Sequence, residues 1–504
     1  MKRSFPVLLC ALIPVFTFVS VSHAQYSIIQ LTYSLYDDPL YQINENGYVV
    51  WRGCFDPVCG VGSPDAGDYE ILLYDGTSTI RLTDDDYGDA NPQINNGGLV
   101  FWTGGDDSGY GIFRYDGTST TLIPSNGYGV GRLQVNDNGH MAWYGSDDGL
   151  DTEILLYNGT SIIQLTDNDY MEGDPQINNN GHVVWEGCDT EDCGVGGDGD
   201  YEIFLFDGTT TSQLTNNDHR DDNPQISNNG YVVWEMCEGG TSYSCTGGDY
   251  EIFLYNGTTT TQLTDNEYDD MVPQINDNGY VVWRGGDYFD ESAWEIFLYD
   301  GTSTTQLTTS DYRHNTAPQI SNSGNVVWRG SDGSHSDIFL YDGASTTRIT
   351  NNAWMDGYPK MNDRGEIVWW SWQTDYWGTA VIDPRIRLAI PCSLEDDNDD
   401  DGYVSFACGG DDCNDGDPAV NPGMSESEVT GNCSDGKDND CDGSPDCNDP
   451  DCPACPTSCA GNAAASTLGA TSVYGASDLG KHLAFFVLPV GAVIGLRIWR
   501  HRKR

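Results

Sequence analysis

Acidic residues and cysteines are concentrated between Cys392 and Cys459, where their types and spacing could bind a metal ion. This stretch contains 19 Asp and Glu, nine cysteines and one basic residue, Lys437. The runs D-N-D-D-D-G, which ends at Gly402, and D-N-D-C-D-G, which ends at Gly443, place carboxylates at alternate positions before a glycine. Oxygens at positions 1, 3 and 5 of such a loop converge on Ca²⁺, and the glycine allows the sharp turn. The predicted metal ligands are Asp397, Asp399, Asp401, Asp411, Asp415, Asp417, Asp438, Asp440 and Asp442.

Two longer runs in this stretch suggest which metal is bound. The run D-C-N-D-G-D-P-A-V-N-P-G, followed by G-K-D-N-D-C-D-G, resembles the MopE-type metal-binding motif and is similar to the type 3 repeats of thrombospondins. The first resemblance implies copper, and the second implies calcium. Hard carboxylate oxygens favour Ca²⁺, and oxidised cysteines cannot serve as thiolate ligands. We therefore predict calcium, with copper as the alternative and a solvated acidic spacer as the interpretation that binds nothing.

The cysteines before this module fall into three close pairs. We predict that each pair forms a local disulfide, because two cysteines are too few for a metal site and the chain is expected to be exported. The pairs are Cys54 with Cys59, Cys188 with Cys193, and Cys237 with Cys245.

No catalytic motif accompanies the metal motif. The eight histidines are scattered, and the sequence contains no H-E-x-x-H, no G-x-S-x-G and no P-loop. Acidic runs, such as 84–89, 167–174 and 265–270, precede several strands of the repeat described below. They could bind cations or a hydroxyl-rich ligand, or they could be solvated loops. We predict on these grounds a protein that is not an enzyme.

An internal repeat must position all of these residues. A core P-Q-I-N-x-N-G-x-V-V-W is followed by a variable insert and then by E-I-F-L-Y-D-G-T-x-T-T-Q-L-T. A period of 41 to 51 residues with four short β segments is typical of propeller blades. The tryptophans that mark the register are Trp51, Trp102, Trp143, Trp185, Trp234, Trp283, Trp328 and Trp369.

The unit from Pro273 to Thr308 illustrates the predicted strands. We expect strands at 273–275, 280–283, 295–299 and 304–308, with Asn278-Gly279 and Asp300-Gly301 supplying the tight turns. The Pro-led first strand, the N/D-G turn and the terminal L-T resemble the TolB-like β-propellers. That resemblance covers roughly residues 27–385 and implies an architecture rather than an activity.

The two ends of the repeat array are predicted to complete one another. The last unit, which begins at Pro359, lacks a fourth strand, and residues 28–32 (I-I-Q-L-T) match the fourth strand of other units. We therefore predict an all-β fold. It is an eight-bladed β-propeller, with seven blades as the alternative, of four-stranded antiparallel blades closed by the N-terminal strand, because an open ring would expose strand edges.

The termini and the composition suggest export. Residues 1–24 read as a signal peptide, followed by the propeller (25–390), the metal-binding module (391–459), a linker (460–481) and a hydrophobic segment with a basic tail (482–504). This C-terminal layout resembles PEP-CTERM sorting signals and implies a membrane or sorting anchor. The net charge of −56 excludes nucleic acid as an expected partner.

The sequence thus predicts an exported bacterial cell-surface or outer-membrane-associated protein, released if its C-terminus is processed. The expected function is binding, through adhesion or interaction with matrix or polysaccharide, with a glycan or a protein as the ligand. One alternative is an extracellular propeller enzyme such as a polysaccharide lyase or hydrolase. A structural surface-layer component is the other alternative.

Overall fold

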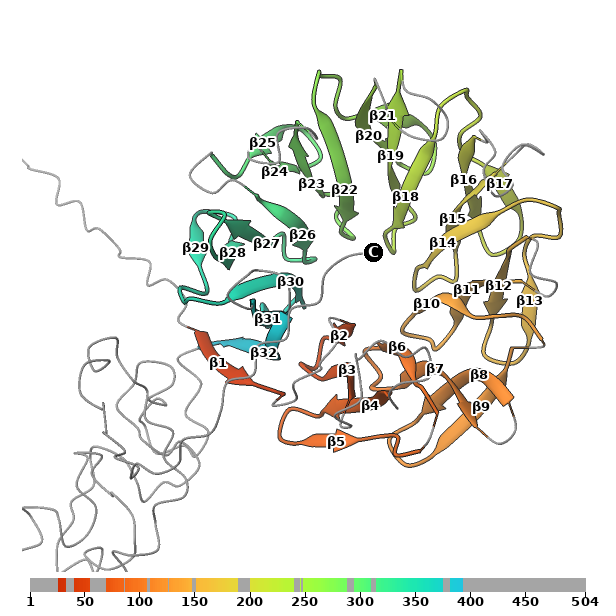
Figure 1. Cartoon of the computed structure of the whole chain (residues 1–504). Helices are drawn as coiled ribbons and strands as arrows, with labels where there is room; N and C mark the ends of the chain where they lie inside the picture. Colours follow the sequence, from red (N-terminus) through yellow and green to blue (C-terminus); the bar gives the residue numbers. More distant parts are fainter. Residues whose placement is uncertain are drawn as a thin grey trace, which may run out of the picture. The chain divides into compact units, whose positions relative to one another are not determined.

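Each repeat folds as four antiparallel strands in a computed structural model of the chain (Figure 1). The structure describes residues 26–392 except 33–39, 55–68, 86, 107–108, 126, 147–150, 189–199, 240–244, 246–247, 288–293, 310–313 and 375–380. The described residues contain strands and turns and no helix. The predicted signal peptide, metal-binding module, linker and anchor therefore lie outside them.

Six of the sheets contain four strands each, in sequence order from the centre of the ring outward. The first three sheets comprise β2 (Tyr41–Ile43), β3 (Val49–Cys54), β4 (Tyr69–Tyr74) and β5 (Thr79–Arg81); β6 (Ala90–Ile94), β7 (Val100–Asp106), β8 (Gly109–Tyr115) and β9 (Thr120–Pro124); and β10 (Gly131–Val135), β11 (Met141–Gly145), β12 (Glu153–Tyr157) and β13 (Ile162–Gln164). The next three comprise β14 (Glu172–Ile177), β15 (Val183–Cys188), β16 (Tyr201–Phe206) and β17 (Thr211–Gln213); β18 (Asp221–Ile226), β19 (Val232–Glu238), β20 (Asp249–Tyr255) and β21 (Thr260–Gln262); and β22 (Asp269–Ile275), β23 (Val281–Gly286), β24 (Glu295–Tyr299) and β25 (Thr304–Gln306).

The last two repeats share an eight-stranded sheet. It contains β26 (Thr316–Ile320), β27 (Val326–Ser331), β28 (Ser336–Tyr341), β29 (Thr346–Arg348), β30 (Met355–Met361), β31 (Ile367–Thr374), β32 (Val381–Pro391) and β1 (Tyr26–Gln30). A single parallel pair, Ser336 with Met355, joins its two halves. The sheets stand around a central axis, so the fold is a β-propeller (Figure 1).

The repeated tryptophans form the core between neighbouring sheets. All eight are at most 1% exposed, and they are the largest of the fully buried side chains. Within a sheet, several stack on the aromatic residue across the strand pair, as Trp283 does on Phe297 with ring centroids 5.9 Å apart. Val281 and Trp283 pack against the preceding sheet, whereas Val282 packs against the following one. The V-V-W motif therefore fills both faces of a strand that is covered on both sides.

The N-terminal strand closes the ring, as predicted. β1 pairs antiparallel with β32, and Leu31, which follows it, is buried with Val368 and Leu388. The hydroxyl of Thr32 accepts a hydrogen bond from Ile386 N at 2.9 Å. In the first repeat, Thr83 accepts the equivalent hydrogen bond from Ile71 N. Residues 26–32 therefore occupy the place of a fourth strand and its L-T end in the last repeat.

The N-x-N-G turns tie neighbouring repeats together around the axis. Asn44 donates from its side chain to the carbonyl of Asn95, and Asn362 of the last repeat donates to the carbonyl of Asn44 at 2.9 Å. The side chain of the residue after this asparagine accepts a hydrogen bond from the backbone N–H of the equivalent residue in the preceding repeat. These hydrogen bonds form a closed ring, because Glu45 of the first repeat accepts from Asp363 of the last. The ring residues are Glu45, Asn96, Asp137, Asn179, Asn228, Asp277, Asn322 and Asp363.

The turn geometry differs in one respect from the prediction, which for Asn278-Gly279 was a tight turn with positive φ at both residues. In both turns of the unit from Pro273 to Thr308, only the glycine adopts positive φ (79° at Gly279 and 88° at Gly301). The Asn or Asp before the glycine does not need a positive φ, because its side chain caps the turn. Asp300, for example, accepts hydrogen bonds from the backbone N–H groups of Thr302 and Ser303.

Candidate active site

One position in the repeat changes its chemistry from unit to unit although its neighbours barely change. This position directly follows the buried tryptophan on the second strand of each sheet, where that strand lies beside the inner strand. The core therefore does not dictate which residue type stands at this position. Its occupants are Arg52, Thr103, Tyr144, Glu186, Glu235, Arg284, Arg329 and Trp370. Because the same backbone site is presented eight times, variation here from acid to base to aromatic marks a candidate for function.

The inner strands opposite this position are irregular. The register shifts by a bulge in β14, β18 and β22, among others, and a residue within the bulge adopts positive φ. In these strands that residue is Asp174 (φ 44°), Asn223 (φ 52°) or Val272 (φ 56°). A left-handed conformation of a residue other than glycine is unfavourable and is found preferentially at functional sites. The bulges re-aim the backbone N–H groups of the inner strands toward the second strand of the preceding sheet.

Glu186 and Glu235 bind these bulge amides. Oε2 of Glu186 accepts from Asn223 N at 3.1 Å, and Oε2 of Glu235 accepts from Val272 N at 2.6 Å. The side-chain amide of Asn223 also donates to Oε1 of Glu235 at 2.6 Å. Asn223 therefore holds the two carboxyl groups of consecutive repeats in one site. Glu235 is 2% exposed with both oxygens bonded, whereas Glu186 is half-buried and its Oε1 has no hydrogen bond to a described residue.

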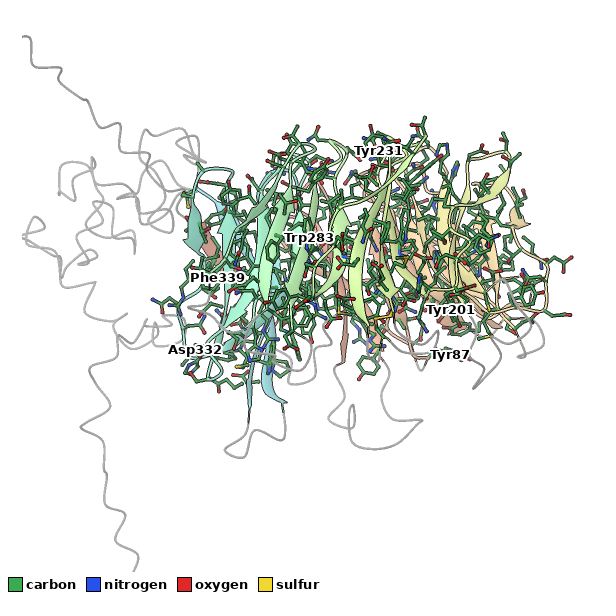
Figure 2. The ribbon with its side chains drawn as sticks, turned by 90° about the horizontal axis from the view of Figure 1, so that it is seen from above. Tyr87, Tyr201, Tyr231, Trp283, Asp332 and Phe339 are labelled. Atoms are coloured by element: carbon green, nitrogen blue, oxygen red, sulfur yellow. A yellow bond between two sulfur atoms is a disulfide. The ribbon has the colours of Figure 1, made fainter. Side chains whose placement is uncertain are left out.

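Two further carboxylates lie beside Glu186, and each is held by an arginine. Asp222 accepts twice from Nε of Arg220, at 2.6 and 2.8 Å, and the guanidinium of Arg220 lies 4.6 Å from the centre of the Tyr201 ring. Asp174 pairs with Nε of Arg132 at 3.0 Å through Oδ1. Figure 2 shows Tyr201 near the face opposite to Tyr231, a residue that directly follows the S-N-N-G turn equivalent to the N-x-N-G turns of other repeats. The cluster thus lies on the side of the ring away from those turns.

Burial and like charge shift the proton affinity of this cluster. Burial and, to a smaller extent, the charges of Asp222 and Asp174 raise the pKa of Glu186 to about 8, against the opposing effects of the Asn223 amide and Arg220. Burial likewise raises the pKa of Glu235 to about 7. The pKa of Asp222 is raised by burial, and its hydrogen bonds to Arg220 oppose that shift. A protonated Glu186 beside arginine-held carboxylates can donate a proton near neutral pH.

The residues predicted to bind metal, Asp397 to Asp442, all lie outside the described residues. Within residues 26–392 as described, no group of three or more His, Cys, Asp or Glu side chains could hold a metal ion. No helix in the same part of the chain is long and apolar enough to span a membrane. Cys237 and Cys245 form a disulfide, and Cys188 is disulfide-bonded, whereas Cys59 and Cys193 are not among the described residues.

The acidic runs are not solvated loops throughout. The carboxylates of Glu172, Asp221 and Asp270 are buried, and each accepts a hydrogen bond of 2.7 Å from the indole N–H of the tryptophan 13 residues later. These acidic residues belong to the first strands rather than to the preceding loops. Part of the predicted ring of cation-binding carboxylates is therefore structural.

Sequence reasoning missed Glu186, whereas Asp174 and Asp222 end acidic runs (167–174 and 218–222) that it put forward as possible cation- or ligand-binding loops. A usable signal was present, because Glu186 and Glu235 stand where other repeats carry Arg, Thr, Tyr or Trp. What the sequence could not provide is the bulge, which brings residues 37 positions apart, Glu186 and Asn223, into contact.

Comparison with known proteins gives matches at the level of structure alone. No family model and no curated protein matches the chain. Among solved structures, it is similar to an acylaminoacyl peptidase of Pyrococcus horikoshii (12% identity, TM-score 0.42, 60% of this chain and 51% of that one). It is also similar to the β-propeller domain of the Trilobed protease from Pyrococcus furiosus (10%, 0.42, 63% and 98%) and to dipeptidyl peptidase 4 of Porphyromonas gingivalis (11%, 0.45, 67% and 57%). The chain spans about half the length of the two peptidases.

These comparisons contradict two predictions made from the sequence. A binding protein without enzymatic activity was expected, whereas the similar structures are peptidases and the propeller domain of a protease. The search for catalytic motifs tested contiguous patterns only, whereas the carboxylates described above come from different strands and repeats. Identities of 10 to 12% concern the fold alone, so an activity has to be argued from the residues of this chain.

Proposed function

We propose that this protein is a hydrolase that cleaves glycosidic bonds of an extracellular polysaccharide, with Glu186 as the general acid. The observation that carries the proposal is the pair of Glu186, whose pKa is about 8, and Asp174, held by Arg132. Glycoside hydrolysis needs one carboxylic acid that protonates the leaving oxygen and one carboxylate that activates water or attacks the sugar. Oε1 of Glu186 and Oδ2 of Asp174 have no hydrogen bonds to described residues and are available for these roles.

Other residues of the cluster position this pair. Asn223 holds Oε2 of Glu186, so the free Oε1 keeps the proton to be donated. Asp222, neutralised in part by Arg220, contributes the negative charge that maintains the raised pKa of Glu186. In the last repeat, four repeats away from Glu186, Trp370 at the equivalent position stacks on Trp372 with centroids 4.4 Å apart, and Tyr358 beside them is 50% exposed. The exposed ring of Tyr358 offers a flat apolar surface that a sugar ring can pack on.

The test is turnover by the full-length protein. The release of reducing ends from a panel of neutral and acidic polysaccharides is measured beside the release of amines from a peptide panel. We expect cleavage of at least one polysaccharide, reduced 10²- to 10⁴-fold in Glu186→Gln, which keeps the hydrogen bond to Asn223 N but loses the transferable proton. Glu267→Gln, an exposed carboxylate outside the cluster, is the matched control. Cleavage of peptides alone, or full activity of Glu186→Gln, would refute the assignment.

We also propose that the ring has eight blades. This count is supported by six separate four-stranded sheets and by the two halves of the eight-stranded sheet, between which the described residues form one strand pair, Ser336 with Met355. The closed ring of hydrogen bonds through the N-x-N-G turns, from Glu45 to Asp363 and back, supports it independently.

For the chain outside the propeller, we propose export by the signal peptide and calcium binding by residues 391–459. The alternating carboxylates of Asp397, Asp399 and Asp401 support calcium, and copper remains the alternative ion. The MopE-type and PEP-CTERM-like resemblances are part of this proposal. Calcium titration of the full-length protein tests it, since the described residues of the propeller contain no metal cluster that would add a second signal.

A further inference from the structure

Lys360 is a lysine in an unusual place. It is the only lysine between residues 4 and 436, a stretch that contains the whole repeat array. Lys360 stands at the glutamine position of P-Q-I in the last repeat, where each of the other seven repeats has glutamine. The glutamine ring is Gln42, Gln93, Gln134, Gln176, Gln225, Gln274 and Gln319. A single cation therefore interrupts a ring of neutral amides on the innermost strands.

A cavity of about 530 Å³ surrounds this lysine. Lys360 shares its lining with Gln42, Gln93, Gln134 and Tyr144, and no described residue of the lining is a carboxylate. The amino group of Lys360 makes no hydrogen bond or ion pair with a described residue, although the chain carries a net charge of −56. Burial of this amine without a counter-ion lowers its pKa to about 8. An unpaired, poorly solvated cation surrounded by amide and hydroxyl donors is complementary to an anion.

Arg132 links the cavity to the candidate active site. Arg132 also lines it, and Nε of the same arginine pairs with Oδ1 of Asp174 at 3.0 Å. A ligand in the cavity would therefore lie one side chain away from the carboxylate that is assigned to activate water.

We propose that Lys360 and the surrounding amides bind an anionic substituent, a carboxylate or a sulfate, of the polymer that the candidate active site cleaves. This inference rests on the proposed hydrolase function and names its substrate class, an acidic polysaccharide. Glutamine side chains donate hydrogen bonds to the anion from the first three repeats, and Lys360 supplies the charge. The site favours acidic over neutral sugars because a neutral ligand would leave the buried ammonium unpaired.

Acetylation of lysine in the full-length protein measures this binding without turnover. Acetic anhydride reacts with neutral amines, and mass spectrometry gives the rate at Lys360 relative to Lys437 in the same molecule. At pH 8 and constant ionic strength set with sodium chloride, we expect glucuronate or sulfate at millimolar concentration to slow the acetylation of Lys360 at least threefold. Glucose should leave the rate unchanged, and the difference between glucuronate and sulfate distinguishes the two anions. Equal rates in glucuronate, sulfate and chloride would overturn the proposal.

Variants at Lys360 separate this claim from the hydrolase assignment. Lys360→Gln restores the residue that seven repeats carry at the same position, so it should fold, and we expect calorimetry with glucuronate or sulfate to show at least tenfold weaker binding. Lys360→Arg should retain binding, and Glu186→Gln should retain the protection of Lys360 while losing turnover. Unweakened anion binding by Lys360→Gln would contradict the anion site alone. If anions protect Lys360 from acetylation but the Glu186→Gln variant is fully active, only the hydrolase assignment is contradicted.

Discussion

Buried polar atoms define the repeat at the scale of single residues. Most of the signature tryptophans bring an indole N–H into the core, and an acceptor 13 residues earlier, at or next to the start of the first strand, compensates for it, as Asp270 does for Trp283. Asn315 has the same role for Trp328 at 3.2 Å. Trp143 is the exception, because the residue 13 positions before it is Val130 and its N–H has no partner among the described residues. The acidic residue at the start of the first strand, in the repeats that have one, is therefore best explained by the tryptophan that follows 13 residues later.

This pairing gives a stability prediction at Asp270. Asp270→Ala leaves the indole N–H of Trp283 buried and unpaired, which should lower the free energy of unfolding by about 1–3 kcal/mol. Asp270→Asn reproduces the arrangement of Asn315 and Trp328 and should be close to wild type. Urea unfolding of the three proteins checks this, and equal losses in both variants would show that the acceptor is not what matters.

Much of the repeat was predictable at the scale of strands, and the reason is local. Residues 280–283 and 295–299 are mostly β-branched, aromatic or aliphatic and lie between turn residues. The structure has β24 over the predicted residues, whereas β23 begins one residue later than predicted and continues three residues further, to Gly286. The first strand was predicted to begin at Pro273, whereas β22 begins at Asp269. Acidic residues such as Asp269 and Asp270 indicate a loop when the sequence is considered alone, and only the contact with Trp283 makes them part of a strand.

The candidate active site was not predictable in the same way. Glu186 becomes a candidate acid because a bulge in the neighbouring repeat brings Asn223 into contact with it and with Glu235. The nearby charge of Asp222 adds to the rise in the pKa of Glu186. None of these contacts follows from spacing within one repeat. The closing strand, in contrast, was predicted correctly because residues 28–32 copy the sequence of a fourth strand.

The closing strand can be tested with two neighbouring positions. Leu31 is buried in a cluster with Val368 and Leu388, so Leu31→Ala should lower the free energy of unfolding by about 2–5 kcal/mol. Ile28 is 42% exposed on β1, and Ile28→Ala should cost about 0.5 kcal/mol or less. Thermal and urea unfolding measure both. Equal, small effects would mean that residues 26–32 are not part of the closed ring in solution.

At the scale of the whole molecule, buried carboxylates make stability depend on pH. Burial raises the pKa of Asp89 and Glu172 to about 7 and that of Asp221 to about 8. The folded state therefore binds more protons than the unfolded state between about pH 4 and pH 8, so stability falls as pH rises through this window. Exposed turn residues such as Asp75 act oppositely: hydrogen bonds from Ser78 and Thr77 lower its pKa to about 2, and that contribution is lost as pH falls below about 4.

Stability should consequently be highest in mildly acidic solution. We expect the urea midpoint at constant ionic strength to be higher at pH 5 than at pH 9, and to fall again below about pH 3. The net charge of −56 acts in the same direction, since self-repulsion grows as the buried acids ionise. A midpoint that rises from pH 5 to pH 9 would contradict the raised pKa values of the buried acids.

The pH dependence of turnover tests the central claim, that Glu186 donates the proton, most directly. On the polysaccharide that the full-length protein cleaves, we predict that kcat/KM falls above about pH 8, since the raised pKa of Glu186 sets the alkaline limb. Glu186→Gln should be at least 10²-fold slower and should lack this limb, and Glu267→Gln should follow the wild type. A wild-type profile that stays level to pH 10, or a Glu186→Gln variant that keeps both rate and profile, would contradict the account.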